Sequence, residues 1–322
     1  MEIVEQKPSK HIFLFLGKGV EYAIIFFKNL ILTILTLGLY YPWAKVEMLK
    51  YFYQTTEFKG NRFTFHGTGA EVFKGFIKVY IVFIALYVFL IYGTSSGRAD
   101  LALISLLLFY VAIILIIPLA IHGAVRYRSS RSSWRGIHFK YFGNRKEMYK
   151  LCLVGFLLTI ITFGIYNSWF KVDLRKYIFK HLKFGNLSFD FIGDGGTLFL
   201  IHLKGIFLSY ITLGIYSFWY MRELYQFHIQ NMVVYQNDKK IMTKFNVSVG
   251  DVFELIVINA ILIIFTLGLA SPWVTTRTLR FFIANVVIEG EFNEDDIKQT
   301  ELDDYGDAAG DDYLDFFDID IL

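Results

Sequence analysis

An eight-residue pattern that occurs four times constrains the fold more than any other feature of this sequence. It reads Thr-(Leu/Phe)-Gly-(Leu/Ile)-x-x-x-Trp, and its copies begin at Thr36, Thr162, Thr212 and Thr266. The threonines are 126, 50 and 54 residues apart. We therefore expect a chain built from similar units. The longer first interval predicts that another element is inserted between the first two of them.

Each copy has the same surroundings. An apolar run precedes the threonine, and a basic amphipathic stretch follows the tryptophan. Glycine turns a helix or permits close backbone packing, and tryptophan suits the boundary between lipid and water, so the motif predicts an interfacial boundary. The motif residues singled out are Gly38, Trp43, Gly164, Trp169, Gly214, Trp219, Gly268 and Trp273.

Composition indicates a membrane protein. The chain is 55% apolar and 19% aromatic, with a mean hydropathy of +0.46. Residues 76–93 and 101–121 are long apolar runs joined by a short loop, which predicts a transmembrane helical hairpin. A single cysteine, Cys152, excludes a disulfide scaffold and a zinc ribbon.

Short alternating segments lie between the apolar elements. They occur at residues 57–67, 133–143, 182–193 and 233–245, each with a central turn. Alternation around such turns predicts β-hairpins, which are too polar to cross a membrane. We expect small sheets in the adjacent aqueous phase.

Charge is divided unevenly along the chain. From Glu289 to Leu322, fourteen acidic residues face one lysine, a net charge of −13, and the remaining chain carries +16. A basic, aromatic-rich body predicts contact with anionic phospholipid head groups rather than nucleic acid. The acidic end predicts a disordered tail whose last residues bind this body or a protein partner.

No catalytic constellation is found, so we expect no enzyme, no cofactor and no metal site. Polar residues inside apolar runs are the candidate intramembrane groups, and they are Lys28, His202, Lys204 and Glu254. Such groups often line a pathway or form pairs, and Lys204 with Glu254 is the first pair to test. The alternative is that they lie near segment ends and reach the interface.

The repeated T-L-G-x-Y-x-x-W before a basic helix, joined to F-x-G-N-x-F-x-F-x-G hairpins, resembles the YjgN-like family of uncharacterised bacterial inner-membrane proteins. The likeness covers roughly residues 10 to 290. One departure is Gln236-Asn237-Asp238, which stands where a hairpin glycine is expected. The resemblance implies a multi-pass protein of the bacterial inner (cytoplasmic) membrane and supplies no activity or functional residues.

The predicted fold class is membrane α-helical with small cytoplasmic β-hairpins. It consists of repeated helix, Thr-x-Gly, Trp and basic-helix units, with two clear transmembrane spans and four spanning or re-entrant segments. The predicted divisions are an N-terminal segment 1–21, repeat unit 1 at 22–75, the transmembrane hairpin 76–121, repeat unit 2 at 122–197, unit 3 at 198–251, unit 4 at 252–288 and the tail 289–322. The distribution of Lys and Arg favours re-entrant segments with both termini cytoplasmic. Uncharged runs of 20 and 22 residues at 151–170 and 255–276 argue for six full spans.

The predicted function is that of a polytopic inner-membrane protein that contacts anionic phospholipid, with transport or organisation of a lipid or amphipathic small molecule as the further hypothesis. Internal repeats and glycine-broken helices are typical of transporters. The alternative is a scaffold that recruits partners through its cytoplasmic hairpins and acidic tail. Transport predicts a cavity lined by the four polar candidates, whereas a scaffold predicts exposed hairpin edges.

Overall fold

Ten strands and five helical hairpins alternate along residues 10–290 and 292–299, the part of the chain that this computed structural model describes. The strands are β1 (Lys10–Phe15), β2 (Thr56–Phe58), β3 (Asn61–Phe65), β4 (Ser132–Trp134), β5 (Ile137–Tyr141), β6 (Leu182–Phe184), β7 (Leu187–Phe191), β8 (Met232–Gln236), β9 (Lys239–Phe245) and β10 (Val286–Glu289). The helices are α1 (Gly19–Leu35), α2 (Tyr41–Thr55), α3 (Gly69–Ser95), α4 (Ala99–Arg131), α5 (Arg145–Ile161), α6 (Asn167–Lys180), α7 (Gly195–Ile211), α8 (Ser217–Gln230), α9 (Val249–Phe265) and α10 (Ser271–Asn285).

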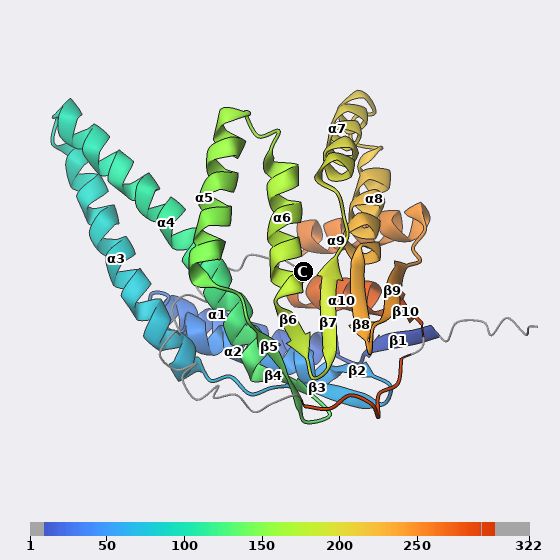
Figure 1. Ribbon diagram of the computed structural model, residues 1–322. Coiled ribbons are helices and arrows are strands. Elements are labelled where there is room, and N and C mark those ends of the chain that lie inside the picture. Colours follow the sequence, from blue (N-terminus) through green and yellow to red (C-terminus); the bar gives the residue numbers. More distant parts are fainter. Residues whose placement is uncertain (1–9, 291, 300–322) are drawn as a thin grey trace, which may run out of the picture.

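All ten strands join in one closed antiparallel barrel. β1 closes it, because residues 10–12 pair with β10 and residues 13–15 pair with β2. Four tight turns connect strands at one end of the barrel, which we call the base. Five helical hairpins connect strands at the other end, and we call them the crown. Figure 1 shows the hairpins α3–α4, α5–α6 and α7–α8 rising from the strands.

The four β-hairpins predicted from the sequence are confirmed, and their turns use left-handed backbone conformations. Lys59 and Gly60 have φ of 48° and 78° in the turn between β2 and β3. Asn237 and Asp238 have φ of 49° and 61° in the turn between β8 and β9. Asparagine and aspartate tolerate this region better than most side chains, so the missing glycine does not prevent the turn.

Aromatic side chains fill the barrel. Phe58, Trp134 and Phe184 are buried there, with ring centroids 5.6 Å apart for the first two and 6.2 Å for the last two. Leucine and isoleucine from β7, β9 and β10 complete this core. The interior is packed with side chains, as expected for a small barrel.

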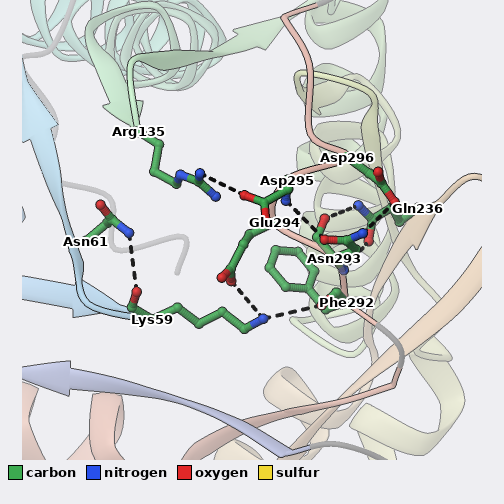
Figure 2. A network of polar contacts seen from close by, with 9 residues as sticks. All are labelled: Lys59, Asn61, Arg135, Gln236, Phe292, Asn293, Glu294, Asp295 and Asp296. Carbon is green, nitrogen blue, oxygen red and sulfur yellow. Dashed lines mark hydrogen bonds and ion pairs between the residues drawn. The ribbon is translucent and has the colours of Figure 1, made fainter.

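Residues 292–299, here called the base segment, cover the end of the barrel that carries the turns. Ile297 is buried in the barrel core, and Phe292 packs against it. Lys59 Nζ lies 2.7 Å from Glu294 Oε2, and an Arg135 guanidinium nitrogen lies 2.9 Å from Asp295 Oδ1. Gln236 and Asn293 exchange two further hydrogen bonds, as Figure 2 shows. The first part of the acidic region thus belongs to the barrel, and residues 300–322 lie outside the described residues.

The predicted fold class is wrong. Instead of separate small hairpins beside a helical membrane protein, the strands form one continuous barrel to which β1 and β10 also contribute. An isolated two-stranded hairpin is marginally stable and leaves unpaired edges, and closure removes both problems. Among the described helices, only α3 and α4 are long and apolar enough to cross a membrane.

The α3–α4 hairpin occupies one of five equivalent places in the crown. It leaves β3 and returns to β4, just as α1–α2 leaves β1 and returns to β2. The long interval between the first two motif copies therefore contains a complete unit of its own, and the expected insertion is a fifth unit without the motif.

Candidate functional site

The repeated motif forms the turn at the tip of each of the four shorter helical hairpins. In the first copy, the backbone N–H of Gly38 donates to the carbonyl of Thr33 at 2.8 Å, and that of Leu37 donates to Ile34 at 3.1 Å. This pairing is the Schellman ending of a helix. The Thr36 hydroxyl donates to the carbonyl of Leu32 and accepts the N–H of Tyr40, so it joins the two helices. Equivalent bonds recur at Thr162, Thr212 and Thr266.

The motif glycines are needed for their backbone conformation. Gly38, Gly164, Gly214 and Gly268 have φ between 89° and 92°, and an added Cβ at any of them would meet no atom within 4 Å. Of the two roles considered for these glycines, the geometry supports the turn and gives no sign of close packing. The motif thus reverses the chain between two antiparallel helices.

The residue before each glycine is the outermost point of the hairpin. These residues are Leu37, Phe163, Leu213 and Leu267, with φ of 51–52° and side chains that are 82–98% exposed. A non-glycine residue in this conformation costs about 1–2 kcal/mol, and a bare apolar side chain in water adds to that cost. All four shorter hairpins share this arrangement and present a large apolar side chain at the tip.

Three of the four motif tryptophans connect neighbouring units of the crown. An added Cβ at Gly69 would lie 2.4 Å from Trp43, and one at Gly195 would lie 2.5 Å from Trp169. Trp273 has the same relation to Gly19, which links the last unit to the first. These indoles remain partly exposed, so packing on the next unit accounts for only one side of each ring.

The polar candidates pair within their own hairpins. Lys28 bonds to Glu47 across α1 and α2, and Lys204 lies 2.7 Å from Glu223 across α7 and α8. His202 Nδ1 lies 2.6 Å from the Tyr220 hydroxyl.

The remaining candidate, Glu254, lies 3.1 Å from an Arg277 guanidinium nitrogen across α9 and α10. The structure does not bring Lys204 and Glu254 together as a pair. The four candidates hold antiparallel helices together and do not gather at one common site.

Cys152, His66 and His138 are further residues of types that can carry chemistry, and each of them packs against other side chains. Cys152 is fully buried in an apolar cluster. His66 Nε2 lies 2.7 Å from the Ser133 hydroxyl, and its ring is 5.2 Å from that of His138. Burial, together with His66 and Arg131, lowers the pKa of His138. Within the described part of the chain, no three His, Cys, Asp or Glu residues are arranged to hold a metal ion.

Two mostly exposed apolar helices and four apolar hairpin tips define the class: this is a membrane protein. The chain belongs to the family described as "Bacterial protein of unknown function (DUF898)", whose profile matches residues 10–185, 138–200 and 220–316.

Three curated relatives confirm the YjgN-like resemblance. The chain is 34% identical over 139 residues, 43% of its length, to "Inner membrane protein YjgN" of Escherichia coli (strain K12). It is 33% identical over 168 residues (52% of its length) to the protein of that name in Escherichia coli O157:H7, and 25% identical over 183 residues (53%) to the one in Salmonella typhimurium. These matches cover 33%, 40% and 44% of the relatives, so the chain spans less than half of each. No solved structure matches the chain significantly.

Proposed function

We propose that this protein is a non-enzymatic protein of the bacterial inner membrane that inserts its crown into the lipid and contacts anionic phospholipid. The observation that carries the proposal is the set of hairpin tips, where large apolar side chains are almost fully exposed. Exposed apolar surface of this extent marks a protein or membrane contact. Because the tips belong to separate hairpins, a fluid lipid phase suits them better than one folded partner.

Helix length agrees with lipid insertion. The 27 residues of α3 and the 33 of α4 extend for about 40 and 50 Å, more than the hydrocarbon thickness of about 30 Å. The most apolar windows of these two helices are only 17% and 22% buried, unlike the core helices of a soluble protein. The 17 residues of α1 extend for about 25 Å, so the shorter hairpins reach only part of the way across.

The charge of the protein supports a cytoplasmic barrel next to anionic head groups. Basic residues cluster in the second helices toward the barrel, as in Arg126, Arg128 and Arg131 near the end of α4. Each such charge near an anionic leaflet contributes roughly 1 kcal/mol. The names of the relatives, which are called inner membrane proteins, add support for this location.

The alternatives fit the structure less well. A scaffold that recruits partners by adding strands needs a free sheet edge, and every described strand is paired on both sides. Transport along the barrel axis needs an open interior, which the aromatic core fills. Organisation or binding of lipid within the crown needs neither a free sheet edge nor an open barrel interior.

The test places an environment-sensitive fluorophore on single cysteines in a Cys152→Ala background. In vesicles, a label at Leu213→Cys is expected to be quenched by nitroxides on lipid acyl chains and protected from aqueous iodide. The control, Arg62→Cys on the exposed face of β3 near the base, is expected to show the reverse. Iodide quenching at the tip would refute membrane insertion. Equal association of spin-labelled phosphatidylglycerol and phosphatidylcholine at all salt concentrations would refute the head-group preference.

A further inference from the structure

A cavity of about 490 Å³ lies where the crown meets the barrel. Its walls come from the C-terminal turns of four second helices, α2, α4, α6 and α10, and from the first residues of β2, β4 and β6. Phe13, Phe63 and Phe139 of the barrel also line it, and these three rings pack on the barrel core. The volume falls in the range of small-molecule sites.

Most of the lining residues are apolar, and two of the hydroxyl groups among them are bonded to helix ends. Thr56 Oγ1 donates to the carbonyl of Phe52 at 2.8 Å, and Ser132 Oγ donates to the carbonyl of Arg128 at 2.5 Å. These hydroxyls satisfy carbonyls that helix ends otherwise leave open. The surface that remains offers water few partners, and an apolar void of this kind is filled by apolar matter rather than by ordered water.

Arg128 is the one charged residue among the described residues that line the cavity. It lies in the last turn of α4 and is only partly exposed. A guanidinium at the edge of an apolar cavity suits a carboxylate or phosphate, which it binds through paired hydrogen bonds. The cavity thus combines a place for a chain of carbon atoms with a place for an anion.

The ends of the crown helices form one side of the cavity. On the other side, the packed aromatic core and the base segment separate it from the solvent at the base. Since the crown carries the exposed apolar surface, a molecule that enters between the hairpins comes from the lipid phase. A ligand that enters in this way meets the filled barrel core below the cavity.

We propose that this cavity binds the acyl chain of an anionic amphiphile, with the carboxylate or phosphate head group at Arg128. The proposal rests on the proposed function, because the crown must lie in lipid for the chain to enter. A free fatty acid and an anionic phospholipid share this chemistry, and the experiment separates them.

The experiment uses the full chain in lipid nanodiscs with three photoactivatable probes: a fatty acid, phosphatidylglycerol and phosphatidylcholine, each with a diazirine in the acyl chain. Labelled peptides are mapped by mass spectrometry. Ala124→Phe and Leu279→Trp fill the cavity from α4 and α10, and Ala85→Phe on the exposed face of α3 is the matched control. Arg128→Gln removes the charge, with Arg126→Gln as its control on the same helix.

We expect the anionic probes to label peptides from the ends of α4 and α6, and either filling variant to abolish this labelling while the tips stay labelled. Arg128→Gln should lower the labelling by anionic probes about tenfold or more, as for loss of hydrogen bonds to a charged group, and Arg126→Gln should not. The anionic probe that labels the cavity identifies the source of the chain.

Labelled tips with an unlabelled cavity would overturn this proposal and leave the proposed function standing, whereas unlabelled tips would overturn the proposed function itself. Labelling that survives both filling variants would also overturn the cavity assignment. Equal labelling by phosphatidylcholine and phosphatidylglycerol would contradict the proposal that Arg128 binds an anionic head group.

Discussion

Substitution of a motif glycine measures the cost of the hairpin turn. Gly214 has a φ of 92°, and a Cβ added there meets nothing within 4 Å, so the whole penalty comes from the backbone. Gly214→Ala is expected to lower the free energy of unfolding by about 1–2 kcal/mol. Gly214→Leu should cost nearly the same, because the larger side chain also points into open space. If the costs at four such sites add, replacing all the motif glycines removes about 4–8 kcal/mol, a large fraction of the roughly 5–15 kcal/mol by which an ordinary protein is stable.

The assay is chemical unfolding of the purified protein in detergent, together with the yield of folded protein from membranes. Gly250→Ala, in the first turn of α9 with ordinary backbone geometry, should be neutral or stabilising by about 0.4–1 kcal/mol. Leu106→Phe on the exposed surface of α4 is the second control and should leave the yield unchanged. Wild-type stability of Gly214→Ala, or a much larger cost for leucine than for alanine, would show that the turn does not depend on this conformation.

Three further predictions concern other parts of the molecule. Since burial, His66 and Arg131 lower the pKa of His138, the unfolded chain binds a proton at higher pH than the folded chain. Stability should then fall as the pH drops below the ordinary histidine value of 6.5, and His138→Gln should flatten this dependence in a pH series of unfolding curves. An impermeant thiol reagent outside intact cells should label a cysteine at the α3–α4 tip but none at the barrel, tested in Cys152→Ala with single cysteines at Ser96, Lys183 and Asn237; labelling at Lys183 would refute a cytoplasmic barrel. Deletion of residues 300–322 should leave membrane insertion intact, as measured by carbonate extraction, because the crown and the base segment precede it.

The sequence predicts those parts of the fold that depend on residues close together in the chain. The four β-hairpins follow from alternation around turn residues, and the position of each hairpin tip is marked by its Thr-x-Gly. Closure of the barrel was not predicted, because β1 pairs with β10 across about 275 residues and no local signal specifies such a partner. The KHIFLF of β1 alternates as a strand does, but the segment is short and has no neighbouring strand in the sequence to mark a hairpin.

The polar pairs show what a different interpretation of the motif would have predicted. In an antiparallel hairpin, residues at nearly equal distances from the turn lie opposite each other. Lys28 precedes Gly38 by ten residues and Glu47 follows it by nine, and Lys204 and Glu223 have the same distances from Gly214. If the motif is interpreted as a boundary between membrane and water, these equal distances have no meaning. If it is interpreted as a tight turn, they predict both pairs.

Closure also explains why the crown contains a unit without the motif. The barrel closes only when every strand finds a neighbour, so each loop between neighbouring strands at the crown end must return to the same rim. A helical hairpin of any length meets this requirement, since it begins and ends at the rim. The length of α3 and α4 is therefore free to match the thickness of a bilayer, while the shorter hairpins keep the turn that presents an apolar tip. The barrel thus fixes where the hairpins are attached and leaves the length of each of them free to vary.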